Sequence, residues 1–339
     1  MATATLPPYL EEAGASFSAG RVAHFGDALA EFRAFQQGSS LLTPLLGTSA
    51  LRVTGADRLD FVHGQLSNDV KRLENSQTNT SLLLNHKGHA LAQVRVLRRD
   101  ADLLLIVEGD AGAFVQQQLE AHIIFDQVEL EPLPLVTLTL QGETAAQLVE
   151  EVLGFVPDPN TFLPFGDGGV VVPAKRSVPG GYDLHVPVED GAALFASLKK
   201  EGAVPAGERT LDTARVLAGI PAVEYEAGEG ILPQEAGLEY AVSYTKGCYL
   251  GQEIMARIEA RGKLRRSLQG LLLADVPQTD EREIFADGKK VGRLGTVAQH
   301  PELGVIGLAV LRNDLDKVGL EVASVSAQVT PLPFVGKTS

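Results

Sequence analysis

The sequence is poor in sulfur and in large aromatic side chains, because its 339 residues include one cysteine, two methionines and no tryptophan. With Cys248 as the only thiol, no intrachain disulfide can form, which excludes a disulfide-stapled secreted domain and suits a reducing compartment. No apolar run approaches the roughly 20 residues of a membrane-spanning helix. The start of the chain lacks the basic and apolar stretches of a signal peptide. We therefore expect a cytoplasmic protein with no membrane partner.

Positive charge is also scarce, since 29 lysines and arginines face 43 aspartates and glutamates, for a formal net charge of −14. This balance excludes a surface that binds nucleic acid or anionic membrane over its whole extent, but it leaves room for a local basic patch. An apolar fraction of 45% with 21% charged residues is typical of a globular chain. The length predicts two or three domains.

The hydrophobic rhythm predicts two similar α+β units in tandem. The first has strands at 51–54, 80–84, 90–97, 103–107 and 127–131, with helices after Gly55 and over 110–121. The order is strand, helix, three strands, helix, strand. With the helices returning over one face of an antiparallel sheet, this order is compatible with a ferredoxin-like split unit. The second has strands at 136–140, 170–173 and 182–186 and helices at 143–153 and 191–199. Prolines 132, 134, 157, 159 and 164 are expected to mark turns and a linker.

The pattern changes after Leu264. Short predicted strands at 268–273, 283–286, 289–294, 305–310 and 321–329 indicate a small all-β domain, a barrel or a sandwich. Before it, residues 221–232 read as a long acidic loop containing Glu224, Glu226 and Glu229. We therefore expect an α+β protein with regions at 1–134, 135–263 and 264–339.

The segment 245–257 concentrates residues that can carry chemistry. Gly247 and Gly251 flank Cys248, and a predicted helix over 251–259 places the thiol just ahead of a helix N-terminus, which favours a thiolate. Lys246 is expected to add to this effect. Glu253 and Arg257 are four residues apart and are expected to pair. A lone cysteine is also often a small buried apolar residue, and the spacing alone leaves both interpretations open.

The run from Lys246 to Arg257 resembles the signature of the YgfZ family of iron–sulfur cluster assembly factors. That signature is Lys-Gly-Cys, an aromatic residue, any residue, Gly-Gln-Glu and a later Arg, and every fixed position is filled here. The family belongs to a wider group with the T-protein of glycine cleavage, an aminomethyltransferase. The wider resemblance covers most of the chain through looser stretches, at 53–57, 65–70, 180–184, 212–215 and 232–238.

The resemblance implies a three-domain ring of T-protein type, with two ferredoxin-like α+β units and a C-terminal β-barrel around a tetrahydrofolate site. It implies assembly or repair of iron–sulfur clusters, chiefly four-iron clusters, in client enzymes. Activity then rests on Cys248, with Lys246, Gln252, Glu253 and Arg257 beside it. Folate contacts are implied at Asn85, Lys87, Gly88, Tyr182 and Arg215. The implied partners are folate and iron–sulfur client enzymes or assembly proteins.

Two departures from T-proteins affect this expectation. T-proteins place an acidic pair after an Asn-x-x-Gly turn, where this sequence has Ala92 and Gln93. T-proteins also grip the pterin with a Glu, which is Leu217 in this sequence. Leucine cannot accept the hydrogen bonds that a carboxylate takes from a pterin. These losses argue against aminomethyl transfer.

Two further clusters each allow two interpretations. Residues 257–266 hold five cations, Arg257, Arg261, Lys263, Arg265 and Arg266, and one acid. They form either a site for a folate glutamate tail, a phosphate or RNA, or a solvated helix end, which we favour slightly. No aromatic run accompanies them, so a nucleic acid partner is not expected. His86 and His89 lack a third ligand nearby, and we predict solvated histidines and no metal.

The leading hypothesis is a YgfZ-like factor acting through Cys248, without classical enzymatic turnover. One cysteine cannot hold a cluster alone, so any cluster contact is shared. The alternative is a folate-dependent aminomethyl or one-carbon transferase of the T-protein type. A second alternative is a folate- or RNA-binding module linked to tRNA modification. The sequence leaves open whether the protein is an enzyme.

Overall fold

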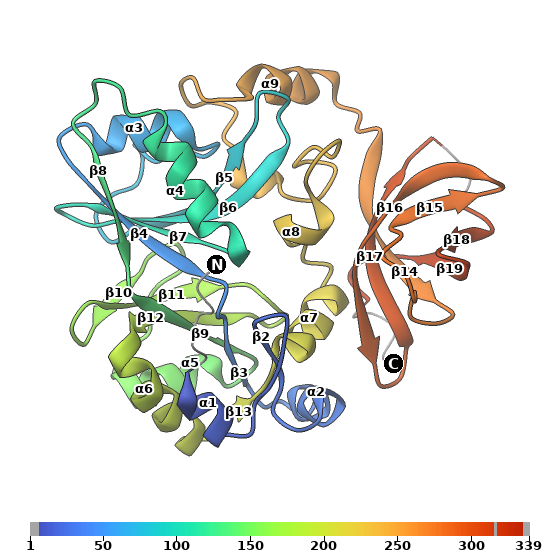
Figure 1. Ribbon diagram of the computed structural model, residues 1–339, viewed down its shortest axis with the longest axis horizontal. Helices are drawn as coiled ribbons and strands as arrows, with labels where there is room; N and C mark the ends of the chain where they lie inside the picture. Colours follow the sequence, from blue (N-terminus) through green and yellow to red (C-terminus); the bar gives the residue numbers. More distant parts are fainter. Residues whose placement is uncertain (1–6, 315–316, 335–339) are drawn as a thin grey trace. The chain divides into compact units, whose positions relative to one another are not determined.

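The computed structural model describes residues 7–314 and 317–334, without the side chains of residues 260 and 261 (Figure 1). Unit 1 comprises Met1–Thr48 and Pro134–Arg215, and unit 2 comprises Ser49–Leu133 and Val216–Ser339. The chain therefore passes between the two compact units three times. In the part of the chain that the structure describes, no helix is both long and apolar enough to cross a membrane.

The first half of unit 2 is an antiparallel sheet with strand order β5-β6-β7-β4-β8, covered on one face by two helices (Figure 1). Apolar residues of both helices share one core with alternate strand residues such as Leu51 and Val53. Its elements are β4 (Ser49–Thr54), α3 (Arg58–Gln65), β5 (Thr78–Leu84), β6 (Ala90–Arg98), β7 (Leu103–Val107), η1 (Gly109–Ala111), α4 (Gly112–Glu120) and β8 (Glu129–Leu133).

This half has the connectivity of the ferredoxin-like unit that the sequence predicts. Four strands lie in the order β8-β4-β7-β6, which is the strand order of a split β-α-β unit. The connection through α4 crosses β4 alone, whereas the connection through α3 leads to β5 and crosses both β7 and β6. β5 is an additional edge strand beside β6. The predicted strands are confirmed with boundaries that differ by at most about two residues, the usual uncertainty of element ends.

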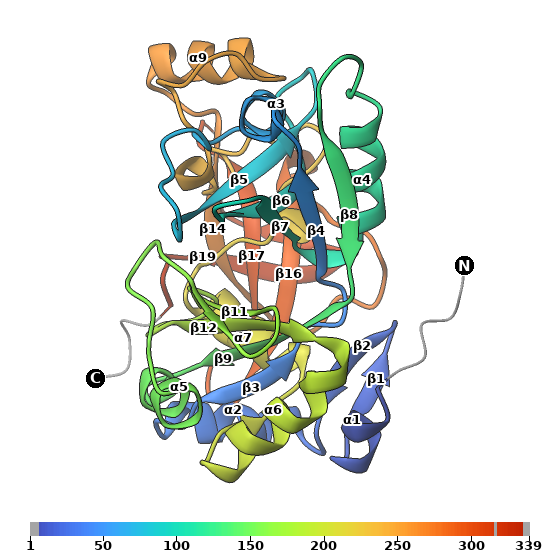
Figure 2. The same cartoon turned by 90° about the vertical axis from the view of Figure 1, so that its left-hand side faces the viewer.

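Unit 1 repeats this element order. Its sheet has the strand order β10-β11-β12-β9-β3-β13, and α5 and α6 pack on it around a shared apolar core (Figure 2). The duplication predicted from the sequence is therefore confirmed at the level of elements. The elements after residue 134 are β9 (Leu135–Gln141), α5 (Ala145–Leu153), β10 (Leu163–Phe165), β11 (Gly169–Ala174), β12 (Gly181–Pro187), α6 (Val188–Lys200), β13 (Val204–Pro205) and α7 (Glu208–Leu217).

The N-terminal segment belongs to the same unit, which the sequence does not predict. Its elements are α1 (Pro8–Glu12), β1 (Ser16–Ser18), β2 (Arg21–His24), α2 (Ala28–Gln36) and β3 (Leu41–Pro44). β3 pairs antiparallel with β9 and parallel with β13, so it lies between them. Consequently, the compact units do not follow the consecutive regions expected from the sequence, because residues 1–48 join residues 134–215.

Two prolines expected in turns lie in strands instead. Pro132 pairs with Leu51 in β8, and Pro164 pairs with Val170 in β10. Both strands are at sheet edges, where the missing proline N–H removes no ladder hydrogen bond. The expectation of turns at these two positions is therefore wrong.

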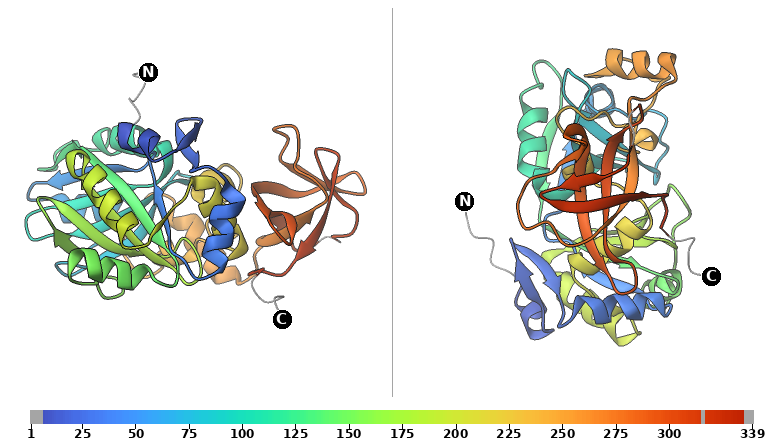
Figure 3. Two further views of the ribbon diagram at one scale, coloured as in Figure 1. Left: turned by 90° about the horizontal axis from the view of Figure 1, so that it is seen from below. Right: turned by 90° about the vertical axis from the view of Figure 1, so that its right-hand side faces the viewer.

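The C-terminal part of unit 2 is a closed six-stranded barrel, one of the two architectures that the strand pattern allows and the one that the resemblance implies (Figure 3). Its strand order is β14-β17-β16-β15-β18-β19, and β19 closes onto β14. One predicted strand, 321–329, is two strands, because Ala323 and Ser324 have positive φ and make a turn. The barrel consists of β14 (Arg266–Leu273), β15 (Glu283–Ala286), β16 (Lys289–His300), β17 (Gly304–Arg312), β18 (Leu320–Val322) and β19 (Val325–Thr330).

The prediction of a long acidic loop over residues 221–232, before the barrel, is partly wrong. It contains the short helix α8 (Val223–Glu226), and Glu226 is only 1% exposed. The Glu226 carboxylate accepts from the N–H of Ala222 and from both the N–H and the hydroxyl of Thr296, each at 2.7 Å. A buried carboxylate needs such donors, so Glu226 ties α8 to β16. Glu224 and Glu229 are exposed, as expected of loop acids.

Candidate functional site

The loop that carries Cys248 is anchored by the residue two positions before it. Lys246 is 6% exposed, and its ammonium donates to the carbonyls of His63, Leu66 (2.5 Å) and Asn68 (3.2 Å). These carbonyls lie in or just after the last turn of α3, where helix carbonyls lack intrahelical donors. A cation at a helix C-terminus is also favoured by the helix dipole. Lys246 therefore caps α3 and fixes the loop to unit 2.

Burial changes the ionisation of the groups around this anchor. Desolvation lowers the pKa of Lys246 to about 8, and the Asp69 carboxylate only partly opposes this. Desolvation first, and the Lys246 cation second, lower the pKa of His63. The Lys246 ammonium also lies 4.7 Å from the centre of the Tyr249 ring, and burial raises the pKa of Tyr249 to about 12. At neutral pH the site therefore holds a neutral imidazole and a neutral phenol.

Cys248 itself is exposed, with no disulfide partner. The interpretation of a buried apolar cysteine is therefore wrong. The expected support from neighbours is also wrong in part, because the Lys246 ammonium is committed to backbone carbonyls on α3. The helix α9 (Gln252–Arg261) begins four residues after Cys248, so the thiol precedes the helix without lying in its first turn. What the geometry provides is an accessible thiol on an immobilised loop.

Three predicted site residues lie on α9. Gln252 is half-buried at its start, whereas Glu253 and Arg257 are exposed. Among the described residues, no ion pair joins Glu253 to Arg257. The expectation that Glu253 and Arg257 pair is therefore wrong. An exposed pair of this kind is worth little in any case.

The start of α9 packs against the turn that holds three predicted folate contacts. A Cβ added at Gly251, which has φ +87°, would lie 2.9 Å from the Asn85 carbonyl oxygen. A Cβ added at Gly88, which has φ +76°, would lie 2.7 Å from the terminal methyl of Met255. Both positions need glycine for the left-handed backbone and for the close approach. The structure thus brings the turn at Asn85, Lys87 and Gly88 together with the cysteine signature.

The turn is ordered by its first side chain. Asn85 Oδ1 accepts from the N–H of Lys87 at 2.9 Å and of His89 at 3.0 Å. Lys87 itself is exposed. His89 Nδ1 accepts from the N–H of Gly230 at 3.3 Å. Desolvation lowers the pKa of His89, so this imidazole is neutral and structural. Within the described residues no three His, Cys, Asp or Glu side chains cluster as metal ligands.

The other two predicted folate contacts belong to unit 1, whereas the turn belongs to unit 2. Tyr182 is in β12 and packs against the unit 1 core, where burial raises the pKa of its phenol. Arg215 is 7% exposed and forms an ion pair with Asp212, at 2.9 Å. Each of these side chains therefore has a role in its own unit.

The positions where T-proteins are expected to carry carboxylates are apolar or neutral. Ala92 is 2% exposed in the core of the first sheet. Gln93 accepts a hydrogen bond from the Tyr240 hydroxyl at 3.3 Å. Leu217 packs with Val216 and Phe334 in an apolar cluster beside the barrel. The structure thus puts packing or neutral hydrogen bonding in place of negative charge.

The sequence did not identify the residues outside the signature that support its loop. Ser67 is fully buried, and its hydroxyl donates to Ala241 O at 2.6 Å and accepts from Leu82 N at 2.8 Å. His63 and Asp69 face each other at 3.4 Å near Lys246. The only signal was the resemblance of residues 65–70 to the wider group. The groups that bind Lys246 are backbone carbonyls, which every residue carries, so they cannot be identified from the sequence.

Similar proteins agree with this architecture. Residues 15–246 match the family described as GCVT N-terminal domain. Aminomethyltransferases of Halalkalibacterium halodurans and Geobacillus kaustophilus are each 30% identical, covering 84% and 83% of this chain and 83% of each relative. A putative chloroplastic transferase of Arabidopsis thaliana is 25% identical, covering 85% of this chain and 69% of that protein.

A solved structure shows the fold. The glycine cleavage system aminomethyltransferase T from Bartonella henselae superposes with a TM-score of 0.85 at 19% identity, over 97% of this chain and 96% of that one. The α+β fold of T-protein type with a C-terminal β-barrel, which the resemblance implies, is therefore confirmed, and the barrel has six strands. On the match over residues 15–246 and the two relatives at 30% identity, the chain belongs to the GCVT aminomethyltransferase-like family.

Proposed function

We propose that this protein is a YgfZ-like factor that assembles or repairs iron–sulfur clusters, chiefly four-iron clusters, in client enzymes. The observation that carries the proposal is the only thiol of the chain, exposed on a loop that a buried cation immobilises. The loop matches the YgfZ signature at each fixed position from Lys246 to Arg257. The cluster is the cargo, and Cys248 is the contact that this chain offers it.

The geometry suits a transient contact better than a resident cluster. Iron–sulfur clusters are usually held by four thiolates, and this chain has one. An exposed thiol can approach a client or an assembly protein without any rearrangement of the loop. Leu250 and Tyr240, which are 43% and 55% exposed in the same part of unit 2, offer apolar surface to such a protein.

Tetrahydrofolate is the proposed small-molecule partner, with Asn85, Lys87, Gly88, Tyr182 and Arg215 as candidate contacts. The described side chains fit it only in part. The exposed Lys87 ammonium can pair with a carboxylate of the ligand. Leu217 packs in an apolar cluster and cannot accept from a pterin. The acceptor that would grip the pterin is therefore missing, and we assign no chemical step to folate.

The test is aconitase activity in cells that lack this gene, complemented with the wild type or with variants. Cys248→Ala and Cys248→Ser are expected to fail, because each removes the thiol. Thr245→Ala, which changes an exposed residue of the same loop, is the matched control and is expected to restore activity. Because Cys248 is exposed, the free energies of unfolding of its variants should lie within about 0.5 kcal/mol of the wild-type value. Full rescue by Cys248→Ala would contradict the proposal.

The second candidate is a folate-dependent aminomethyl or one-carbon transferase of the T-protein type. The 30% identity to two aminomethyltransferases favours it. The absence of carboxylates at Ala92, Gln93 and Leu217 opposes it, because no described group there serves as a general base. Because these carboxylates are absent, we expect the purified protein to show no one-carbon transfer to tetrahydrofolate above background. A rate above background would favour this candidate instead.

A further inference from the structure

A cavity of about 1080 Å³ lies in unit 2, between the barrel and the segments that lead into it. Two of its wall residues are carboxylates, Glu229 and Asp314. The aliphatic part of the lining includes Ile231, Leu264 and Val310, and none of the described lining residues is aromatic. Its cationic lining residues are Lys263, Arg265, Arg266, Lys290, Arg293 and Arg312. Among the lining residues that the structure describes, six cations against two carboxylates leave an excess of four positive charges, in a chain whose net charge is −14.

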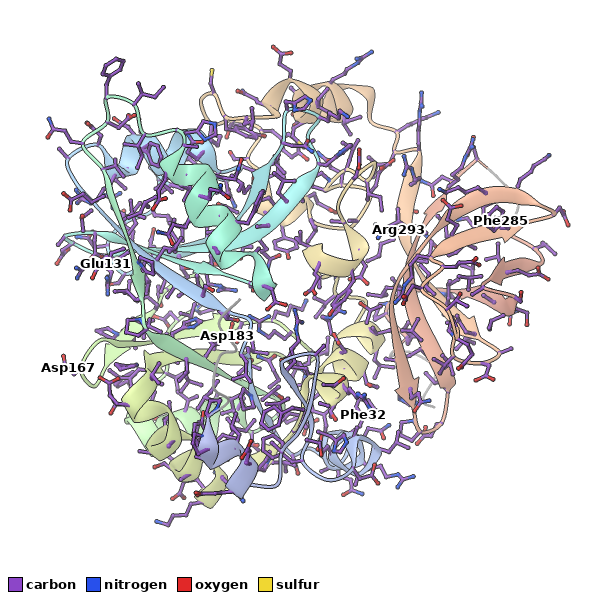
Figure 4. The ribbon with its side chains drawn as sticks, viewed as in Figure 1. Phe32, Glu131, Asp167, Asp183, Phe285 and Arg293 are labelled. Atoms are coloured by element: carbon purple, nitrogen blue, oxygen red, sulfur yellow. The ribbon has the colours of Figure 1, made fainter. Side chains whose placement is uncertain are left out.

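The barrel register gathers the arginines on one face. Arg266 of β14 lies directly opposite Arg312 of β17. Arg293, which is labelled on the barrel in Figure 4, belongs to β16 and pairs with Val310. Val310 is two residues from Arg312, so the register places Arg293 and Arg312 on the same face. Like charges directly opposite each other in a sheet are unfavourable. The fold therefore maintains a repulsive cluster that needs negative charge nearby.

The ion pairs within the chain satisfy only half of this cluster. Arg312 pairs with Asp314 at 2.7 Å, and Arg266 approaches Glu235 at 3.6 Å. Lys290 pairs with Glu283. The exposed side chains of Lys263, Arg265 and Arg293 have no ion pair with any residue that the structure describes. Three cations at the cavity thus stay available to an anion from outside.

The chemistry of the lining selects the class of anion. A phosphate group offers three oxygens and close to two charges, so one group can engage several arginine forks together. A carboxylate offers two oxygens and one charge. Single-stranded nucleic acid binding relies on aromatic stacking surfaces, which this lining lacks. The volume is of the size that holds a small molecule.

We propose that this cavity binds a small molecule that carries a chain of two or three phosphates, a site separate from Cys248. Arg265, Arg293 and Lys263 are the residues that contact the phosphates. Gly230 in the cavity wall donates its N–H to His89, which closes the turn at Asn85. The phosphate site therefore borders the elements that pack under α9.

The experiment is calorimetric titration of the full-length protein with sodium tripolyphosphate at low salt. We expect binding that weakens as salt rises. The double variant Arg265→Gln/Arg293→Gln should bind at least about tenfold more weakly, because two charge-assisted contacts are lost. The double variant Lys199→Gln/Lys200→Gln makes the same charge change on exposed residues of α6 and should stay within about twofold of the wild type.

Four outcomes would overturn the proposal. The first is no binding of tripolyphosphate. The second is equal weakening in both double variants, which would reduce the effect to net charge. The third is binding of citrate as tightly as tripolyphosphate, which would make the site a carboxylate site. The fourth is binding of a 20-nucleotide oligouridine RNA more tightly than tripolyphosphate, which would assign the patch to nucleic acid. Lys263→Gln alone, which should weaken binding severalfold, provides an independent variant.

Discussion

Lys246 carries its ammonium group to backbone carbonyls that lie about 180 residues earlier in the sequence. Three carbonyls and the Tyr249 ring surround the cation, and together they offset the cost of taking it out of water. The sequence predicts that Lys246 helps to activate the thiol, but in the structure Lys246 anchors the loop that carries Cys248. This role predicts an effect on stability that depends on pH.

We expect Lys246→Met to lower the free energy of unfolding by about 2 kcal/mol near pH 7, because hydrogen bonds from a charged donor are lost and carbonyls of α3 lose their cap. The pKa of Lys246 is about 8 in the folded protein and 10.5 when exposed. Between these values the unfolded chain binds more protons, so this group makes the wild type more stable as pH rises.

The measurement is urea denaturation of the wild type and Lys246→Met at pH 8.0 and pH 9.5. The stability difference between them should grow by roughly 1–2 kcal/mol over this interval. Lys200→Met, which changes an exposed lysine, should show no such growth. A difference that is flat or shrinks with pH would contradict the buried, carbonyl-bound ammonium.

At the scale of elements, α9 and the Asn85–Gly88 turn act as one part. The two glycines at their contact leave no room for a Cβ, so the helix start and the turn are in van der Waals contact. Cys248, on the loop before α9, therefore depends on the position of the turn between β5 and β6. We therefore predict that a single methyl group added at this contact displaces the start of α9 from the turn.

We expect Gly251→Ala to destabilise unit 2 by about 2–4 kcal/mol, from the left-handed backbone and from the clash with Asn85 O. Gly262→Ala is the matched control. Gly262 has φ +63° at the other end of α9, but its added Cβ meets nothing within 4 Å. It should cost only the backbone strain, about 1 kcal/mol. Hydrogen exchange should rise around residues 85–88 in Gly251→Ala alone, and equal effects of the two variants would refute the contact.

Elements with strong local patterns could be predicted from the sequence. β7, Leu103–Val107, is a continuous apolar run, and β4 alternates as a half-buried strand does. β3 and β13 could not be predicted, because four and two residues carry no period and their partners are distant. The signature residues were found by identity, but the role of Lys246 depends on backbone carbonyls. Glu226 was misjudged because its donors come from β16.

At the scale of the whole molecule, unit 1 is built from two separated stretches of chain. β3 lies in its sheet between β9 and the edge strand β13, and Leu10, Val22 and Leu42 contribute to the core of the unit. The buried Glu31 of α2 accepts from Gly207 N at 3.1 Å and from the Thr210 hydroxyl at 2.5 Å. Neither stretch can therefore close this core alone.

Deleting residues 1–48 should abolish the cooperative unfolding of unit 1, because β9 and β13 lose the strand between them and apolar surface becomes exposed. We expect aggregation, or loss of protease resistance over 134–215. The matched control is full-length protein nicked after Thr48, which keeps the segment in the sheet and should remain resistant. A monomeric deletion variant with native circular dichroism and a single sharp transition would contradict this prediction.

The position of β3 also has a consequence for synthesis on the ribosome. β3 begins at residue 41, whereas its neighbours β9 and β13 begin at residues 135 and 204. The N-terminal segment therefore emerges first but finds its place only after the intervening residues 49–133, which form the complete first sheet of unit 2, have been made. Domains generally fold as they emerge from the ribosome. Here the segment 1–48 is made first but can fold only after residues 134–215 have been made. Until then its apolar strand is exposed, and this interval is when a chaperone would be needed.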